Sequence, residues 1–350
     1  MSIFLDKNVM MQSKKSTYII AEMSANHAGD INRAKEIIYA AKESGADCIK
    51  IQTYTPDTMT IDCNKSWFNI DNGTWCGENL YSLYKKAYTP WEWQGELKEE
   101  ANKIGIDFLS TPFDKTSVDF LEELGVNFYK IASFELVDIP LLKYVASKGK
   151  PIILSTGMAT LGEIEDAVNT IRSNGCNQIV LLKCASAYPA ITDQMNLVTM
   201  RNMGEVFNVP VGLSDHSMGS VGAIAAVAMG ARIIEKHFCI SRQIENPDSV
   251  FSMEPDEFKN MVRDIRQVEL AIGQVKYGPT EQEHSNIAFR RSIFVVDSIK
   301  KGEKFTENNI RIIRPGYGLA PKYYDKVIGC VALRDIERGE PLTLNLFGEL

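Results

Sequence analysis

The stretch ARIIEKHF, residues 231–238, places three titratable side chains at the end of an apolar run. Its branched apolar residues are typical of a buried β-strand, yet Glu235, Lys236 and His237 follow them without a break. A strand that is apolar where it fills a core and polar where it enters a functional site has this composition. The stretch therefore predicts a core strand whose last residues contribute to chemistry.

The same pattern recurs along the chain. Seven other strand-like runs precede this one, and amphipathic helix-like runs lie between them. They are YIIAEMSA (18–25), CIKIQT (48–53), DFLST (107–111), FYKIAS (128–133), PIILST (151–156), IVLLKCAS (179–186) and PVGLSD (210–215). Eight strand–helix units predict an α/β fold, the (β/α)8 or TIM barrel. An open doubly wound sheet is the alternative, but no GxGxxG motif follows the first strand.

The remaining sequence predicts the domain boundaries. The barrel pattern ends near residue 273, a polar linker covers 274–289, and a small β-rich module covers 290–350. Inside the module SIKKGEKFT (298–306) is echoed by DIERGEPLT (335–343), which indicates internal symmetry. Residues 54–89 form a long aromatic-rich insertion, which we interpret as a lid or substrate-binding loop.

Composition excludes several classes of protein. The formal net charge of the 350 residues is -7, which argues against a nucleic-acid-binding surface. No apolar run is long enough to span a membrane, and the first 16 residues lack the apolar core of a secretion signal. The seven cysteines include no CxxC pair, so we expect neither a disulfide framework nor a zinc knuckle, and a reduced cytoplasm fits best.

Every predicted strand ends in polar residues. In a (β/α)8 barrel the active site lies at the carboxyl ends of the strands, so these side chains are expected to converge. They are Glu22, Ser24, Asn26, His27, Lys50, Gln52, Ser110, Thr111, Lys130, Ser133, Ser155, Thr156, Lys183, Ser186, Ser214, Asp215, His216, Glu235, Lys236 and His237. One or two such residues commonly cap turns, but turn capping does not explain all eight strand ends.

Two types of side chain suggest specific chemistry. His216 and His237 follow neighbouring strands, so both imidazoles can reach one divalent metal in an open site; wall residues are the alternative. Lys50 and Lys130, with Lys183 or Lys236 as further candidates, point toward the barrel mouth. Beside several hydroxyl groups they favour a phosphate and carboxylate site, although a single lysine can also act as a Schiff-base nucleophile.

The motifs as a set resemble the sialic acid synthase family. The resemblance rests on IAEMSANHAGD, IKIQTYTPD, STPFD, YKIASFE, ILSTGMAT, GLSDHS and IEKHF, and RPGYG and GCVALRDIERGE resemble the family's C-terminal antifreeze-like (SAF) domain. SANHAG, KIQTYTPD and ASFE are most similar to the branch that makes pseudaminic acid. The resemblance implies a transferase that condenses phosphoenolpyruvate with 2,4-diacetamido-2,4,6-trideoxy-L-altrose, releasing phosphate. N-acetylneuraminate and legionaminic acid synthases are the alternatives.

The resemblance also implies roles for single residues. His216 and His237 would bind Mn²⁺ or Mg²⁺, with His237 also counted as catalytic, and Glu22 and Glu135 would be the catalytic carboxylates. Asp248 would contact the amino sugar, and Arg314 would reach the partner's sugar site in a domain-swapped homodimer. Further substrate-binding residues would be Lys50, Gln52, Thr111, Lys130, Ser133, Ser155, Tyr188 and Ser214. His27 has no assigned role beyond hydrogen bonding.

Three rival functions follow from parts of the pattern. A 3-deoxy-octulosonate-phosphate synthase would share the phosphoenolpyruvate site but lack the C-terminal module. A Schiff-base aldolase would use one strand lysine, and an ice-binding protein would use the C-terminal module alone. The polar residues at all eight strand ends argue against the last.

Overall fold

The structure is a computed structural model that describes residues 16–347. The chain forms two compact units, of which the first ends at Gly273 and the second begins at Gln274.

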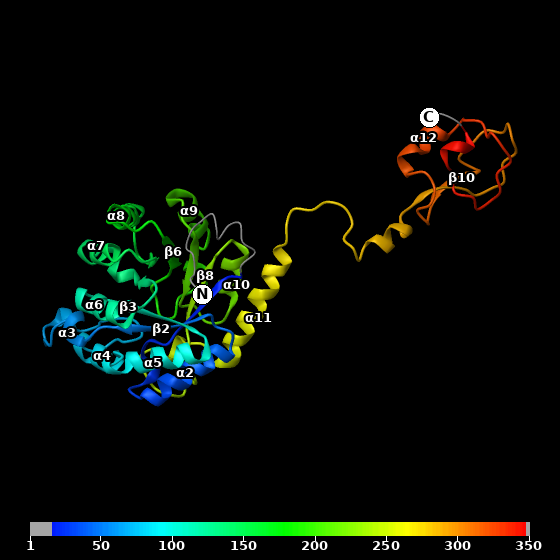
Figure 1. The fold of residues 1–350 in the computed structure, drawn as a ribbon. Helices are drawn as coiled ribbons and strands as arrows, with labels where there is room; N and C mark the ends of the chain where they lie inside the picture. The colour runs from blue at the N-terminus through cyan, green and yellow to red at the C-terminus, as the bar shows by residue number, and fades with distance from the viewer. Residues whose placement is uncertain (1–15, 348–350) are drawn as a thin grey trace. The chain divides into compact units, whose positions relative to one another are not determined.

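The first unit is a barrel of eight parallel strands in the order β3-β2-β1-β8-β7-β6-β5-β4 (Figure 1). The two outermost strands of this order, β3 and β4, pack against each other and bring the sheet round on itself. The predicted (β/α)8 barrel is therefore confirmed. The strands are β1 (Tyr18–Glu22), β2 (Cys48–Thr53), β3 (Asp107–Pro112), β4 (Tyr129–Ile131), β5 (Ile152–Ser155), β6 (Ile179–Cys184), β7 (Val211–Asp215) and β8 (Ile233–His237).

A main helix follows each strand and lies on the outside of the barrel (Figure 1). These helices are α2 (Ile31–Glu43), α5 (Trp91–Ile104), α6 (Lys115–Leu124), α7 (Ile139–Ser147), α8 (Leu161–Ser173), α9 (Val198–Phe207), α10 (Val221–Ala228) and α11 (Pro255–Ile272). In α2, apolar residues at helical spacing, from Ala34 to Ala41, are buried, and the Asp30 carboxylate caps the first turn by accepting from Asn32 N. Such amphipathic faces bury the outer side of the sheet.

The strands bury apolar residues on both faces, as expected for a parallel sheet. A large cluster fills the space between strands and helices, and a second, smaller one fills the inside of the barrel. The interior is so tightly packed that a Cβ atom on Gly212 of β7 would lie 2.3 Å from the Ile233 carbonyl oxygen and 2.7 Å from Leu182. This position therefore requires glycine.

Three strands end two or three residues earlier than the sequence pattern predicts. β1 stops at Glu22 and gives way to the 3-10 helix η1 (Ser24–His27), β4 stops at Ile131 before η3 (Ser133–Val137), and β6 stops at Cys184. In the first case the backbone turns away at Ser24, which has a φ of 44°. The polar residues after these strands consequently lie on tight turns over the barrel mouth.

The 54–89 insertion is mostly ordered into short elements. It contains α3 (Pro56–Met59), η2 (Ser66–Phe68) and α4 (Leu80–Ala87), and a bridge joins Asn69 to Asn79. Further short 3-10 helices follow β6 and β8, namely η4 (Thr192–Gln194) and η5 (Ser249–Phe251).

The second unit has its own small core around a two-stranded antiparallel sheet of β9 (Ser292–Val295) and β10 (Ile310–Ile313). The two echoed segments pair with each other: Ile299 and Ile336 exchange both backbone hydrogen bonds, at 2.9 and 2.8 Å. The internal repeat therefore builds the module by self-pairing. The unit also contains η6 (His284–Phe289), which falls within the predicted linker, η7 (Pro321–Tyr323), α12 (Tyr324–Val327) and η8 (Leu344–Leu346).

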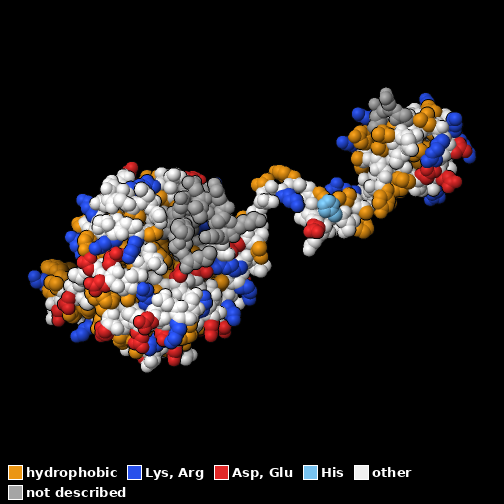
Figure 2. Space-filling view, in the orientation of Figure 1, with side chains coloured by type: hydrophobic (Ala, Val, Ile, Leu, Met, Phe, Trp, Pro, Cys, Tyr) orange, Lys and Arg blue, Asp and Glu red, His pale blue; other side chains and the backbone are white. Residues whose placement is uncertain are grey.

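Charges of both signs are interspersed on the face shown in Figure 2. This mosaic differs from the basic stripe that binds a nucleic-acid backbone. Within residues 16–347, no helix combines the length and apolarity needed to cross a membrane.

Candidate active site

The polar residues at the barrel mouth follow directly from strand alternation. Every second residue of a strand points to the same side, and the apolar cluster inside the barrel contains one or two residues from most strands. Two residues further along, the same face becomes polar, so the barrel interior changes from an apolar floor to a polar layer. The pairs are Ile20 and Glu22, Cys48 and Lys50, Leu109 and Thr111, Phe128 and Lys130, Ile153 and Ser155, Leu182 and Cys184, and Ile233 and Glu235.

Four buried charges form the centre of this layer. The Lys50 ammonium lies 2.6 Å from a carboxylate oxygen of Glu22 and 3.7 Å from one of Glu235. The Lys130 ammonium also lies 3.7 Å from Glu235. The four side chains expose less than a tenth of their surface. Two cations and two carboxylates are therefore held together away from water.

The two carboxylates respond differently to this environment. Burial raises the pKa of Glu22, with the Lys50 ammonium opposing the shift. Burial also acts to raise the pKa of Glu235, but the positive charges of Lys130 and Lys50 outweigh burial, so the pKa of Glu235 is lowered. Burial disfavours the charged form of Lys50, yet the carboxylates of Glu22 and Glu235 raise its pKa. The site thus keeps Lys50 positively charged in a buried position.

Hydroxyl groups surround these cations. Lys50 Nζ donates to Thr111 Oγ1 at 3.3 Å, and Ser214 donates to Glu235 at 3.0 Å. Ser133 accepts from Gly157 N at 3.0 Å, and Ser155 is buried at the end of β5. Lysines with convergent hydroxyls suit an anion that carries phosphate and carboxylate groups.

Several polar atoms at the mouth have no partner. Buried polar atoms in proteins are almost always hydrogen-bonded, so exceptions call for a reason. In the described part of the chain the exceptions all lie at or just after β1, β4, β5 and β8, although Glu22 Oε2 does meet Lys50 as an ion pair. Their concentration at one end of the barrel indicates a place for a ligand. They are Glu22 Oε2, Asn26 Oδ1, Glu135 Oε2, Ser155 Oγ, Glu235 Oε2 and His237 Nδ1.

The two predicted metal ligands lie side by side. The imidazole centroids of His216 and His237 are 5.4 Å apart. His216 Nδ1 lies 3.1 Å from the Ala185 carbonyl oxygen, which only accepts, so this nitrogen carries a proton. Burial acts to lower the pKa of His216, but Cys184 and the Ala185 carbonyl outweigh this effect and raise it. Burial, together with His216, lowers the pKa of His237 well below its usual value, so its ring is neutral.

These two rings fit an open metal site. His237 Nδ1 is buried without a hydrogen-bond partner, as expected of a nitrogen atom whose lone pair binds a metal ion. Among residues 16–347, no three His, Cys, Asp or Glu side chains come together as metal ligands. The protein would therefore supply two imidazoles and leave the remaining positions to water and substrate.

An aromatic wall stands next to the histidines. The Tyr188 ring lies 4.3 Å from the His216 ring and 5.2 Å from that of Phe251, between centroids. Trp75 of the 54–89 insertion packs on Tyr188 at 5.3 Å, and its indole nitrogen donates to the Pro247 carbonyl oxygen at 2.8 Å. The insertion therefore reaches the loops after β6 and β8 and closes one side of the mouth.

Two polar residues from other parts of the barrel bond to the end of β1 and to η1. Asp248 is buried, and its carboxylate accepts from Ala25 N at 3.1 Å. Gln52 Nε2 donates to Glu22 and to Ser24, both at 2.9 Å. These groups link the charged centre to the aromatic side of the site.

Glu135 lies on η3, just after β4. Burial raises its pKa to about 7, with Lys130 opposing the shift, and its Oε2 atom has no hydrogen-bond partner. A carboxyl group with such a pKa can hold or release a proton near neutral pH.

Two lysines considered for the mouth lie elsewhere. Lys236 is buried on the opposite face of β8, where its ammonium pairs with Asp215 at 2.9 Å. Lys183 lies on the same outward face of β6 and donates to the Cys184 carbonyl oxygen at 3.1 Å. The prediction that either points into the mouth is wrong, because alternation places Glu235 and Cys184 inside and their neighbours outside.

His27 is a buried structural histidine. Its Nδ1 atom accepts from Gly29 N at 3.1 Å, and its Nε2 atom lies 3.3 Å from the Thr89 hydroxyl. Burial, with Arg33, lowers its pKa to about 4. It joins η1 to the end of the 54–89 insertion rather than contacting the polar layer.

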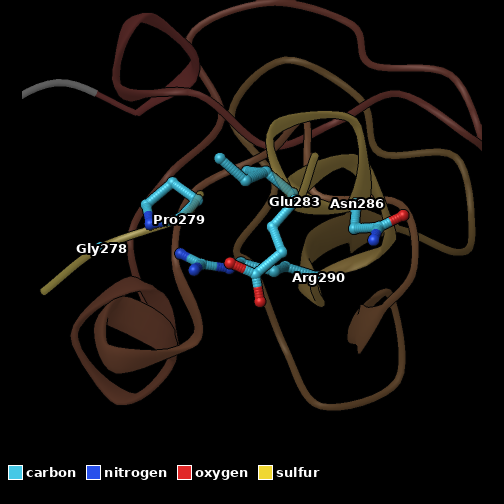
Figure 3. A pocket seen from close by; sticks show the side chains of 6 residues that line it. Gly278, Pro279, Glu283, Asn286 and Arg290 are labelled. Carbon is cyan, nitrogen blue, oxygen red and sulfur yellow. The ribbon is translucent and has the colours of Figure 1, made fainter. Parts of the chain in front are cut away.

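Arg314 belongs to the second unit. It directly follows β10, is exposed, and makes no ion pair within the described residues. The same unit carries a groove of about 420 Å³ lined by Gly278, Pro279, Glu283, Asn286, Ile287 and Arg290 (Figure 3). None of the predicted site residues lines this groove.

Three residues at the site were given no specific role from the sequence. Glu235 and Ser24 were expected among the converging strand-end residues, and Glu235 proves central to the charged layer. Ser24 joins Gln52 to Asp248, and Trp75 reaches Tyr188 across 113 residues of chain. No local pattern marks either of the last two contacts.

Comparison with known proteins places this geometry in a family. Residues 37–277 match the NeuB family and residues 290–347 the SAF domain. The chain is 46% identical to a pseudaminic acid synthase from Helicobacter pylori, over 95% of this chain and 98% of the relative. It is 40% identical to an N,N'-diacetyllegionaminic acid synthase from Campylobacter jejuni, over 93% and 98% of the two chains.

A solved structure extends the likeness to three dimensions. It is the N-acetylneuraminic acid synthetase from Leptospira borgpetersenii in complex with citrate, 33% identical, with a TM-score of 0.70 over 79% of this chain and 91% of that one. Family match, sequence identity and fold agree along most of the chain. The chain belongs to the NeuB family and carries a C-terminal SAF domain.

Proposed function

We propose that this protein is a pseudaminic acid synthase. It condenses phosphoenolpyruvate with 2,4-diacetamido-2,4,6-trideoxy-L-altrose and water to give pseudaminic acid and phosphate. The observation that carries the proposal is the buried layer of Lys50 and Lys130 among hydroxyls and unpartnered oxygens, a site prepared for a small multiply charged anion. The higher identity to a pseudaminic acid synthase than to a legionaminic acid synthase supports the choice of sugar.

Phosphoenolpyruvate occupies the charged layer in this proposal. Its phosphate and carboxylate groups lie against Lys50 and Lys130, and hydroxyls donate the directed hydrogen bonds. The unpartnered Ser155 hydroxyl gains an acceptor on binding. The hydroxyl donors are Thr111, Ser133, Ser155 and Ser214.

The reaction forms one carbon–carbon bond and breaks one carbon–oxygen bond. C3 of phosphoenolpyruvate attacks the aldehyde carbon of the sugar, water adds to C2, and phosphate leaves with the oxygen that joined it to C2. The Glu22 carboxylate, beside Lys50, faces the positive character that develops at C2. Glu135, with its pKa raised to about 7, exchanges the proton that the added water gives up.

His216 and His237 would hold Mn²⁺ or Mg²⁺. Such an ion, when bound, polarises the aldehyde carbonyl as a Lewis acid. The two rings are held by their own surroundings, His216 by the Ala185 carbonyl and His237 by the Phe251 ring at 5.0 Å. The protein thus orients both donors before any ligand arrives.

The aromatic side of the site would hold the sugar. Tyr188, Trp75 and Phe251 offer an apolar wall that suits a 6-deoxy sugar with two acetamido groups, and Asp248 and Gln52 offer hydrogen bonds to its polar atoms. N-acetylneuraminate and legionaminic acid synthases remain the alternatives, because they differ in the sugar and not in the anion site.

We further propose that the active enzyme is a domain-swapped homodimer in the cytoplasm. Exposed apolar side chains follow several strands at the mouth, which indicates a surface that a second copy covers. The exposed apolar residues are Phe134, Met158, Ile191, Met218 and Val250. Arg314, exposed and without an ion pair among the described residues, would reach the partner's sugar.

The proposed cytoplasmic location is supported by the cysteines. All seven are unpaired, as in a reducing compartment.

A phosphate-release assay tests the sugar. The purified protein would be given phosphoenolpyruvate with N-acetylmannosamine, the legionaminic precursor or the pseudaminic precursor. We expect turnover mainly with the last. A preference for N-acetylmannosamine would overturn the assignment within the family.

A further inference from the structure

Ser24 has a backbone conformation that disfavours its own side chain. Its φ of 44° lies in the left-handed region, which glycine enters freely and residues with a Cβ atom enter at a cost. The residue is 7% exposed and follows β1 at the barrel mouth. A serine at such a strained position indicates that its side chain makes interactions that glycine could not make.

The Ser24 hydroxyl uses both its acceptor and its donor capacity. Its Oγ atom accepts from Gln52 Nε2 at 2.9 Å. Its proton is directed to the Asp248 carboxylate, which cannot donate when ionised. Replacing the hydroxyl by hydrogen or a methyl group removes both bonds at once.

These bonds complete a continuous chain across the site. Lys50 pairs with Glu22 at 2.6 Å, Glu22 accepts from Gln52 at 2.9 Å, and Gln52 donates to Ser24, which reaches Asp248. One end of the chain lies in the anion site and the other in the proposed sugar site. Within this chain, Ser24 is the link between Gln52 and Asp248.

We propose that Ser24 is a positioning residue for the amino sugar. Its hydroxyl fixes the directions of the Asp248 carboxylate and the Gln52 amide, and thereby aligns the sugar with the anion held by Lys50. The inference rests on the proposed function, because it assigns Asp248 and Gln52 to the sugar.

The same turn contains a matched control. Ala28 also has a positive φ, of 45°, but its methyl group makes no hydrogen bond. Ala28→Gly relieves backbone strain as Ser24→Gly does, yet leaves the network intact. It separates the effect of strain from that of the hydroxyl.

The experiment measures steady-state kinetics and thermal unfolding of Ser24→Ala, Ser24→Gly and Ala28→Gly in the full chain. For both Ser24 variants we expect the KM for the pseudaminic precursor to rise at least tenfold, while the KM for phosphoenolpyruvate changes less than twofold. Ser24→Gly should melt at a higher temperature than Ser24→Ala, and Ala28→Gly should keep wild-type kinetics. A purely structural serine would change both KM values in step with stability.

Two results would overturn the inference in distinguishable ways. Unchanged sugar KM in Ser24→Ala, with an active wild-type protein, overturns the role of Ser24 alone. A wild-type protein that releases no phosphate with any of the three sugars overturns the proposed function and this inference with it.

Discussion

His216 and His237 present their imidazole rings to each other at a centroid distance of 5.4 Å, from the ends of the neighbouring strands β7 and β8. The parallel pairing of these strands, with Asp215 opposite Lys236, brings the two rings to the same height in the barrel. His237 Nδ1 has no partner, and His216 Nδ1 is tied to the Ala185 carbonyl oxygen, so His216 would offer Nε2 to a shared divalent cation.

Removal of one ring tests this shared site. We expect His237→Ala to lose Mn²⁺ binding, measured by calorimetry or electron paramagnetic resonance, together with at least a hundredfold in activity. EDTA should abolish wild-type turnover, and added Mn²⁺ should restore it. His284→Ala, in an exposed stretch of the second unit, is the control and should bind metal normally. Mn²⁺-dependent activity in His237→Ala would contradict the assignment.

Lys50→Ala tests the anion site. The substitution leaves Glu22 and Glu235 buried with one cation fewer, so we expect the free energy of unfolding at pH 7 to fall by about 3 kcal/mol. The KM for phosphoenolpyruvate should rise at least a hundredfold. Lys35→Ala breaks an exposed pair with Glu96 and should cost less than about 1 kcal/mol. Similar losses in the two variants would show that the Lys50 pair has no special role.

Glu135→Gln gives a pH-dependent effect on stability. In the unfolded chain this carboxyl group ionises around pH 4.5, but in the folded protein its pKa is about 7. The folded state therefore binds more protons between these values, so the contribution of Glu135 to stability falls as pH rises through them. Glutamine stays neutral and avoids this loss.

Chemical denaturation at pH 5 and pH 8 measures this effect. The free energy of unfolding of Glu135→Gln, relative to wild type, should increase from pH 5 to pH 8 by at most about 3 kcal/mol, reduced by the partial exposure of the side chain. Glu36→Gln, an exposed change on α2, should show no such trend. Activity of Glu135→Gln should fall by about 10²-fold or more. If the free energy of unfolding of Glu135→Gln, relative to wild type, decreased from pH 5 to pH 8, the raised pKa of Glu135 would be refuted.

Trp75→Ala tests the aromatic wall. The indole packs on Tyr188 and Phe251 and bonds to Pro247, so its loss opens the sugar side of the mouth. We expect the sugar KM to rise at least tenfold, with the phosphoenolpyruvate KM nearly unchanged. Trp67, on the same insertion, is 72% exposed, and Trp67→Ala should behave like wild type. Equal effects of the two substitutions would remove Trp75 from the site.

Subunit complementation tests the role of Arg314. Arg314→Ala and His237→Ala should each be inactive or nearly so. If Arg314 acts in the partner's barrel, a mixed dimer contains one intact site and one site with both lesions, so random mixing should restore about a quarter of wild-type activity. If Arg314 acts in its own barrel, no mixed dimer has an intact site, and activity stays absent.

The strand-end pattern of the sequence was sufficient to predict much of the site. Period-two alternation is a local property, so RIIEKHF already places Ile233, Glu235 and His237 on one face. Closure of the barrel then decides that this face is the interior, which is why Lys236 is buried behind the strand against Asp215 and does not reach the mouth.

The sequence by itself determined the number and order of the strands, the polar character of their carboxyl ends and the presence of an internal repeat in the C-terminal module. Only the tertiary structure decided which of those polar residues meet: Glu235 between Lys50 and Lys130, Ser24 between Gln52 and Asp248, and Trp75 against Tyr188. The physical reason is the separation along the chain of the residues that determine each feature. Alternation and amphipathicity depend on neighbours a few residues apart, whereas these contacts depend on how the barrel closes and how a long insertion lies across its mouth.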